Sequence, residues 1–264
     1  MSKEKLYVVK IGGNVIDNEA ALDAFLDDFS KIKAKKILIH GGGKIATEIS
    51  KGLGIEAQMI DGRRVTDAET LKIVTMVYGG LINKNIVCKL QSKNTNALGF
   101  TGADANLMLA KKRAVKNGID YGFVGDVEQV ESNNLSAFIN LGLTPVFAPL
   151  THDGEGNMLN TNADTVASAI AVSLASHFEV NLVYSFELKG VLSDFENKDF
   201  VIPEMTPPEY KKLKDEGVIS KGMIPKLDNC FEAINGGVSS VLICQATDLL
   251  PIVNGAKMGT MLMG

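Results

Sequence analysis

The chain has 264 residues, of which 45% are hydrophobic, and its formal net charge at pH 7 is -4. This length and this hydrophobic content allow a large buried core, which argues against a disordered chain. The negative charge and the scattered lysines argue against a protein that binds nucleic acid by neutralising its phosphates.

The sequence alternates between short apolar runs and segments with helical periodicity. Runs rich in Val, Ile and Leu predict strands at residues 6–11, 36–40, 97–100, 144–149, 181–185 and 239–244. Helical periodicity predicts helices at residues 19–31, 44–53 and 66–78. Because this alternation is typical of βαβ units, we predict an α/β fold with a mainly parallel central sheet sandwiched by helices.

Two glycine turns follow the first two predicted strands. Lys10 ends the first strand directly before Gly12 and Gly13, and the glycines at 41–43 follow the second strand after His40. Glycine lets an anion approach the free N–H groups and the positive dipole end of a helix N-terminus. The turns therefore predict chemistry between two anionic ligands, with a structural role for His40.

The third predicted helix has a sequence signal for its start. Thr66 and Glu69 have the spacing of a capping box, which predicts that the helix begins at Thr66. Arg64 would then lie just outside the helix, beside a turn rich in donors. Further along, residues 122–131 predict a strand or hairpin that lies over the sheet.

Polar residues alternate before a long helix that we expect at residues 163–178. Asn160, Asn162 and Asp164 would share one face of an extended stretch, although an N-cap role explains Asn162 or Asp164 singly. The helix is interrupted by polar residues and is too short to span a membrane, so we expect it to be buried. Lys226 lies at the start of another predicted helix, where a cation is unfavourable unless an anion is near.

The cysteines give no sign of a metal or redox site. Cys88, Cys230 and Cys244 lie far apart, without the spacing of a zinc site or a dithiol. We expect all three to be reduced thiols in the core of a cytoplasmic protein, and no metal site built by the protein. No secretory leader is expected before the first strand.

Seven short motifs together resemble the amino acid kinase family, in the order that the family shows. They occupy residues 10–13, 40–43, 62–67, 122–125, 160–164, 222–226 and 259–260. No Walker A motif or dinucleotide-binding fingerprint is present. The resemblance implies the carbamate kinase-like fold, as a single domain of residues 1–264 with an N-lobe to about residue 175 and a C-lobe from about residue 176.

Within the family, the motifs are most similar to the branch that acts in arginine biosynthesis. The resemblance implies transfer of the γ-phosphoryl group of ATP, with Mg²⁺, to the side-chain carboxylate of an N-acyl-L-glutamate such as N-acetyl-L-glutamate. A glutamate-like carboxylate is already ionised at neutral pH, so no general base is needed. Positioning and charge neutralisation must then supply catalysis.

The resemblance also implies roles for individual residues. Lys10 and Lys226 would neutralise the transferring phosphoryl group, and Asp164 would orient both lysines. The substrate-binding residues would be Gly42, Gly43, Arg64, Asn160 and Asn162. The nucleotide-binding residues would be Gly12, Gly13, Glu187, Leu188, Gly190, Val191, Leu192, Ile219 and Ser220.

Two positions depart from the family pattern. Glu187 stands where the family has aspartate, with Phe186 and Lys189 nearby, so the nucleotide site is reshaped. Arg63 stands where an apolar residue is more usual, and it could bind the extra carboxylate of an N-succinyl group. Alternatively, Arg63 is simply solvated, since adjacent residues of an extended chain point to opposite faces.

Several alternatives remain open from the sequence. The acceptor could be N-succinyl-L-glutamate, or the chain could be another family member such as an aspartokinase or a glutamate 5-kinase. A non-catalytic ligand sensor is a third possibility, suggested by the altered residues near Glu187. By analogy we expect a homodimer that meets through the helix at residues 66–78, with no nucleic-acid or membrane partner.

Overall fold

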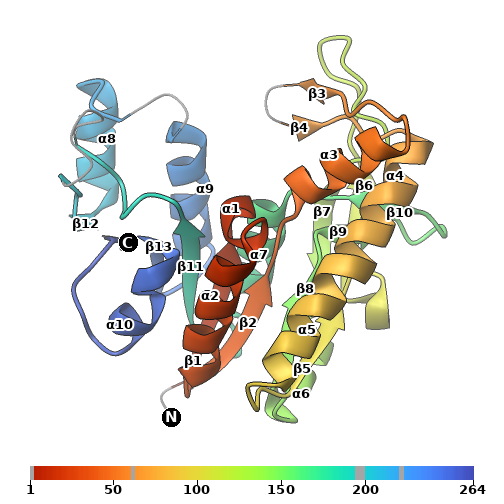
Figure 1. The fold of residues 1–264 in the computed structure, drawn as a ribbon. Helices are drawn as coiled ribbons and strands as arrows, with labels where there is room; N and C mark the ends of the chain where they lie inside the picture. The colour runs from red at the N-terminus through yellow and green to blue at the C-terminus, as the bar shows by residue number, and fades with distance from the viewer. Residues whose placement is uncertain (1–2, 61–62, 194–199, 220–222) are drawn as a thin grey trace.

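The computed structural model describes residues 3–60, 63–193, 200–219 and 223–264, and an eight-stranded sheet forms its centre (Figure 1). In sheet order the strands are β12 (Glu204–Met205), β14 (Thr260–Leu262), β13 (Ser240–Gln245), β11 (Glu179–Phe186), β1 (Lys5–Ile11), β2 (Lys35–Ile39), β8 (Thr144–Phe147) and β5 (Ala97–Phe100). All neighbours are parallel except β13 and β14. The predicted mainly parallel sheet is confirmed, and all six predicted strands belong to it.

Two smaller sheets lie beside the central one. One has four strands in the order β10 (Met158–Asn160), β9 (Leu150–His152), β6 (Met108–Lys112) and β7 (Gly125–Val130). The other pairs β3 (Met59–Ile60) with β4 (Arg63–Arg64) in antiparallel fashion. The segment predicted as a strand or hairpin at residues 122–131 therefore supplies β7.

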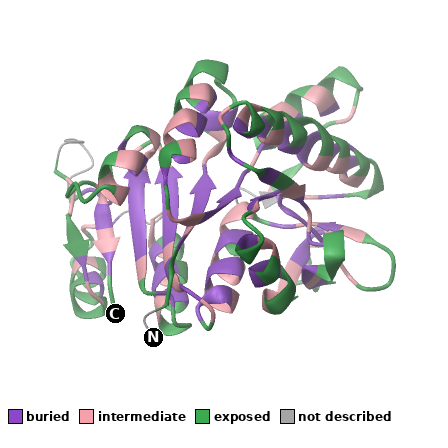
Figure 2. Cartoon of the chain, turned by 90° about the horizontal axis from the view of Figure 1, so that it is seen from below, coloured by how far each residue is buried: buried purple, intermediate pink, exposed green. Residues whose placement is uncertain are grey.

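Helices cover both faces of the central sheet (Figures 1 and 2). They are α1 (Gly13–Ile16), α2 (Glu19–Lys31), α3 (Gly43–Gly52), α4 (Ala68–Val74), α5 (Asn83–Gln91), α6 (Ser132–Asn140), α7 (Ala163–Leu174), α8 (Pro207–Asp215), α9 (Ile224–Asn235) and α10 (Leu249–Val253). Short 3₁₀ turns occupy Asp104–Asn106 and Ala246–Asp248. In the described part of the chain, no helix has the length and apolarity needed to cross a membrane.

The alternation of side chains along β1 decides which helices face Lys10. Leu6 and Val8 belong to the core cluster that contains Ile170 of α7, whereas Val9 and Ile11 belong to the cluster that contains Phe25 of α2. Since side chains two residues apart share a face, Lys10 points to the α7 side of the sheet. The strand thereby directs one cation toward the start of α7.

The capping box predicted at Thr66 is wrong. The N-cap of α4 is Asp67, whose Oδ1 accepts a hydrogen bond of 2.8 Å from the backbone N–H of Thr70. Thr66 is instead fully buried, and its hydroxyl accepts a hydrogen bond from Asn160. The helix also continues past residue 78, through a π-helical segment at Thr75–Ile82 and into α5.

The helix expected at residues 163–178 ends earlier, because α7 stops at Leu174. The residues that follow connect α7 to β11, and Phe178 packs in the core cluster of the α7 face. Of the other predicted helices, residues 19–31 match α2, and residues 44–53 match α3 to within one residue.

Candidate active site

Two cavities adjoin at the N-terminal end of α7. The first, named the Arg64 cavity, has a volume of about 210 Å³ and is lined by Arg64, the glycines at 41–43 and residues 160–163. The second, named the Lys226 cavity, has a volume of about 320 Å³ and is lined by Lys10, Asp164 and Lys226 among others. One helix start therefore contributes to both cavities.

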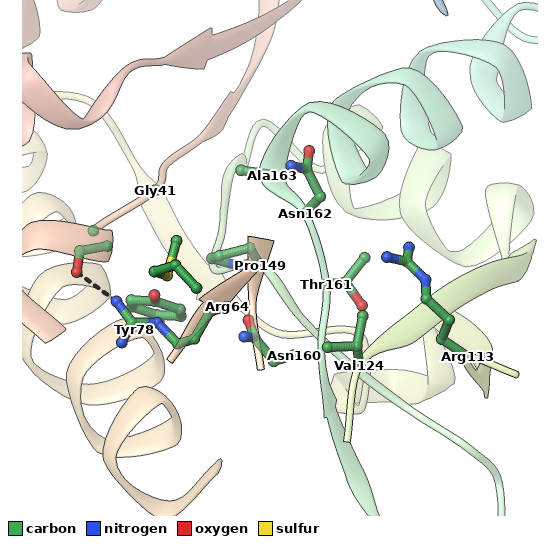
Figure 3. Close-up of a pocket in the computed structure, with 13 residues that line it drawn as sticks. Gly41, Arg64, Tyr78, Arg113, Val124, Pro149, Asn160, Thr161, Asn162 and Ala163 are labelled. Carbon is green, nitrogen blue, oxygen red and sulfur yellow. Dashed lines mark hydrogen bonds between the residues drawn. The ribbon is translucent and has the colours of Figure 1, made fainter. Parts of the chain in front are cut away.

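Arg64 lies at one end of the Arg64 cavity, beside Tyr78 and Gly41 (Figure 3). Its Nη2 donates hydrogen bonds to the carbonyl of Gly43 at 2.8 Å and to Oγ1 of Thr47 at 2.7 Å. Its buried Nη1 has no hydrogen-bond partner among the described residues. A guanidinium that is anchored through one nitrogen and unpaired at another is suited to bind a carboxylate.

The glycine turn after β2 leaves backbone donors unused. Gly42 is the N-cap of α3, and within the described chain the N–H groups of Gly41 and Gly42 donate to no protein acceptor. Gly43 begins the helix, so its N–H has no intrahelical acceptor either. The turn therefore presents a row of donors toward the Arg64 cavity, as its sequence predicted for an anion site.

Replacing Gly42 by alanine is expected to destabilise the protein by about 2–4 kcal/mol. Gly42 has φ of 143°, and a Cβ built there would lie 2.2 Å from Cδ1 of the buried Ile82. Gly43→Ala is the matched control, because its Cβ would meet no atom within 4 Å. Urea unfolding measures both; equal free energies for the two variants would contradict the prediction.

His40 has the structural role that the sequence favoured. Its ring is fully buried, Nδ1–H donates to the carbonyl of Gly41 at 2.8 Å, and Nε2 accepts from Nδ2 of Asn83 at 3.1 Å. The carbonyl of Gly41 can only accept and the Nδ2 group of Asn83 can only donate, so Nδ1 carries the proton, Nε2 carries none, and the ring is neutral. Burial lowers the pKa of His40 to about 4, which keeps the ring neutral.

We expect His40 to make the protein less stable in weak acid. Its pKa is about 4 when folded against a model value of 6.5, so the unfolded chain binds the additional proton as the pH falls below about 6.5. The free energy of unfolding should then drop by about 3 kcal/mol between pH 6.5 and 4, and the contribution is fully present above that window. Urea titrations of the wild type and of His40→Asn at several pH values test this. An equal pH dependence in both proteins would contradict it.

The three polar residues around the start of α7 do not share one face. Asn162 is the N-cap of α7, and its Oδ1 accepts from the N–H groups of Asp164 and Thr165. Asn160 lies in β10 and donates from Nδ2 to Oγ1 of Thr66 at 3.0 Å. Asn160 and Asn162 line the Arg64 cavity, whereas Asp164 lines the Lys226 cavity. The prediction of a shared face is wrong, because the helix has already begun at Ala163.

Lys10 and Asp164 form a shielded ion pair. Nζ of Lys10 lies 2.8 Å from Oδ1 of Asp164, and the two side chains are 11% and 26% exposed. Lys10 comes from the end of β1 and Asp164 from the first turn of α7, so the pair joins the sheet to the helix. The carboxylate holds the ammonium group at the wall of the Lys226 cavity.

Lys226 reaches the same cavity from α9 but pairs differently. No carboxylate lies within ion-pair distance of its Nζ in the described ranges, so the second ion pair that we expected from Asp164 is not formed. Its Nζ lies 4.2 Å from the centre of the Phe186 ring. Lys226 therefore contacts the ring of Phe186, whereas we had expected it to pair with the carboxylate of Asp164.

The glycine turn after β1 differs from the prediction in one respect. The N–H of Gly12 donates to the carbonyl of Ser185 at 3.1 Å, so it is engaged in the protein rather than bare. Gly12 and Gly13 both line the Lys226 cavity, together with Glu187, Leu188 and Gly190. These five predicted nucleotide-binding residues are therefore brought together around the two lysines.

The other predicted nucleotide-binding residues do not line this cavity. Val191 and Ile219 belong to the core cluster of the α7 face, and Leu192 is only 6% exposed. The N–H of Val191 donates to Oγ1 of Thr260 at 2.8 Å, and this hydrogen bond anchors the segment that follows β11. Their apolar side chains complete the core under the turn. Ser220 lies outside the described residues.

The Arg64 cavity is also lined by residues that the sequence analysis did not select as site residues, including Met59, Tyr78, Arg113 and Pro149. Tyr78 comes from the π-helical segment, and burial raises its pKa, so its hydroxyl stays protonated. Arg113 and Val124 stand at the end opposite Arg64 (Figure 3). The basic run that ends at Arg113 was the available sequence signal. No motif surrounds it, so only the fold brings it to the cavity.

The family model described as the amino acid kinase family matches residues 5–245. The chain belongs to the amino acid kinase family. The resemblance drawn from the seven motifs is thus confirmed. Among curated amino acid kinases, the acetylglutamate kinase of Cytophaga hutchinsonii is 68% identical over 261 residues, which cover 98% of this chain and 99% of the relative.

Solved structures show the same fold. N-acetylglutamate synthase from Neisseria gonorrhoeae has a TM-score of 0.83 and 20% identity, with 100% of this chain and 60% of that chain covered. Carbamate kinase from Giardia has a TM-score of 0.68 and 13% identity, with 100% and 99% covered. The carbamate kinase-like fold expected of an amino acid kinase is therefore confirmed.

Proposed function

We propose that the chain is an ATP-dependent kinase that phosphorylates the side-chain carboxylate of N-acetyl-L-glutamate, a step of arginine biosynthesis. The observation that carries this is the meeting of two cavities at the start of α7. One cavity holds an arginine with an unpaired nitrogen, and the other holds two lysines. The choice of N-acetyl-L-glutamate as the acceptor is supported by the 68% identity to an acetylglutamate kinase.

The chemistry follows from the charges at the site. The acceptor carboxylate is ionised at neutral pH and attacks the γ-phosphorus of ATP, while the bond from that phosphorus to the bridging oxygen of ADP breaks. Lys10 and Lys226 neutralise charge on the transferring group, and Asp164 orients Lys10. The product is an acyl phosphate.

We assign the acceptor to the Arg64 cavity. Arg64 would bind the α-carboxylate through its unpaired Nη1, and Asn160 would bind the acyl amide. The N–H groups of Gly42 and Gly43 would support the reacting carboxylate, and Asn162 would contribute through its position in the cavity wall. This orientation directs the side-chain carboxylate toward Asp164 and the lysines.

We assign ATP to the Lys226 cavity, with Gly12 and Gly13 at its phosphates and Glu187, Leu188 and Gly190 at the nucleoside end. Mg²⁺ would arrive with ATP and be held mainly by phosphate oxygens and water. Among the residues that the structure describes, no cluster of three or more His, Cys, Asp or Glu side chains could hold a metal ion. The acceptor would belong to an N-lobe of about residues 1–175 and ATP to a C-lobe of about residues 176–264.

A hydroxylamine trap tests the proposed reaction, because acyl phosphates react with it to give hydroxamates. With ATP and Mg²⁺, N-acetylglutamate should give hydroxamate and equal ADP, whereas free glutamate and aspartate should give at least about 100-fold less. We expect this difference in rate because free glutamate and aspartate both lack the acyl amide. Preference for aspartate or free glutamate, or binding of N-acetylglutamate without turnover, would overturn the proposal in favour of another kinase or a sensor.

N-succinyl-L-glutamate is a second candidate acceptor, favoured by Arg113. Its Nε and Nη2 donate to Asp126, but its buried Nη1 has no partner within the described residues. The guanidinium stands at the end of the Arg64 cavity opposite Arg64 (Figure 3), where a third carboxylate would lie. The side chain of Arg63, our earlier candidate for this contact, lies outside the described residues.

Comparing the two acceptors decides between them. If the acceptor is N-succinylglutamate, its kcat/KM should exceed that of N-acetylglutamate, and Arg113→Met should lower it about 10- to 100-fold. The same substitution should change kcat/KM for N-acetylglutamate less than threefold. A wild type that prefers N-acetylglutamate would exclude the second candidate.

We further propose a cytoplasmic homodimer without nucleic-acid or membrane partners. Met76, in the helix at residues 66–78 that we expect at the contact, is 59% exposed, and Leu81, in the π-helical segment that continues this helix, is 47% exposed. Light scattering at micromolar concentration should give twice the mass of the chain, and Met76→Glu with Leu81→Glu should halve it. A monomeric wild type would exclude this assembly.

A further inference from the structure

We propose that Phe186 is a positioning residue for phosphoryl transfer, whose ring holds Lys226 and Lys10 at the Lys226 cavity through cation–π contacts. The inference rests on the proposed function for its kinetic consequence. Nζ of Lys226 lies 4.2 Å from the centre of the ring, and Nζ of Lys10 lies 5.3 Å from it. Both distances are within the range of about 6 Å over which a ring attracts a cation.

Lys226 has a particular need for such a contact. It is the third residue of α9, where the positive end of the helix dipole disfavours a cation. Lys10 adds a like charge at the same cavity, and Asp164 pairs with Lys10 rather than with Lys226. In the part of the chain that is described, the electron-rich face of Phe186 is the compensating group that contacts Lys226.

The ring of Phe186 is itself held in place. It stacks on Tyr184 with ring centres 5.9 Å apart and planes within 5°. The two residues are two apart on β11, so their side chains share one face of the sheet. The hydroxyl of Tyr184 donates to the carbonyl of Asp164 at 3.1 Å, and Tyr184 is the neighbour of Lys10 across the β1–β11 pair. Contacts therefore run from the start of α7 through two rings to Lys226.

The placement distinguishes Phe186 from a residue that only fills the core. Its side chain is partly exposed and lines both the Lys226 cavity and a small cavity of about 20 Å³. A leucine would fill much of the same volume without an electron-rich face. The proposal therefore predicts that kcat falls in Phe186→Leu but is largely retained in Phe186→Tyr.

Steady-state kinetics give the first test. Phe186→Leu and Phe186→Met should each lower kcat about 5- to 30-fold, with KM for the acceptor changed less than twofold, whereas Phe186→Tyr should keep at least half of kcat. Phe200→Leu is the control, since Phe200 is 58% exposed and lines neither cavity. Wild-type kcat in the leucine and methionine variants, or an equal loss in the tyrosine variant, would overturn the proposal.

A second readout does not depend on turnover. In the ligand-free protein, NMR of ¹³C-labelled lysine should show the ε-methylene protons of Lys226 shifted upfield by the ring, and the shift should disappear in Phe186→Leu. Lys226→Arg assigns the signal. An unshifted signal in the wild type would refute the contact even if the kinase assay succeeds, whereas failure of the assay with every acceptor would refute only the proposed function.

Discussion

Replacement of Lys10 by methionine is expected to lower kcat about 10²- to 10³-fold while KM for the acceptor changes less than threefold. Methionine retains the apolar stem of the side chain but removes the ammonium group, which lies 2.8 Å from Oδ1 of Asp164 at the Lys226 cavity. Charge on the transferring phosphoryl group would lose one of its two neutralising cations. Initial rates of hydroxamate formation at saturating ATP measure the effect.

The control for Lys10→Met is Lys212→Met, because the Lys212 side chain is 72% exposed on α8 and should leave kcat unchanged. Lys10→Met also leaves Asp164 without its cation, so a thermal melt must show that the variant is folded. A folded Lys10→Met protein with wild-type kcat would remove Lys10 from the mechanism. A change confined to KM would make it a binding residue instead.

Much of the fold could be predicted because the sequence pattern and the burial agree. The apolar runs that predicted β1, β2, β8, β11 and β13 are largely buried on both faces, whereas the edge strand β5 exposes Leu98. Residues 19–31 show a helical period that α2 follows between its Asn18 cap and Lys31. The strands β6, β9 and β10 were not predicted. They are short and have exposed or partly exposed ends, and although β9 and β10 pair locally, β6 pairs with β9 only through a bridge from Leu109 to the distant His152.

The errors near the site have a common physical cause. Thr66 and Asp67 are both good caps, and the sequence alone could not show that Thr66 would be buried against Asn160. In the same way, Asp164 could pair with either lysine until the fold placed the Phe186 ring beside Lys226. The sequence identified residue types that are suited to these roles, but the partner of each residue depends on tertiary packing.

Arg113 is a cavity residue that could not be predicted from the sequence. It follows β6, and its side chain enters the Arg64 cavity only because the small four-stranded sheet sets that strand beside β7. The motif residues, by contrast, were found because each lies where a strand ends or a helix begins, and such positions have their own residue preferences. Site residues at strand ends and helix starts could therefore be predicted from local sequence patterns. A residue that reaches the site only through strand pairing could not.

Replacement of Arg64 by leucine is expected to raise KM for the acceptor about 10²- to 10³-fold, with kcat reduced less than tenfold. The substitution removes Nη1, so the α-carboxylate of the acceptor would lose its partner. The hydrogen bonds from Nη2 to Gly43 and Thr47 would be lost as well. Arg64→Lys should recover little, because a lysine cannot reproduce the planar fork that bridges these groups. Thr47→Val is the matched control: it removes one anchor and leaves the guanidinium, so KM should rise less than about fivefold. If Arg64→Leu lowered kcat with KM unchanged, Arg64 would act on the transition state, and the α-carboxylate would have to be bound elsewhere in the cavity.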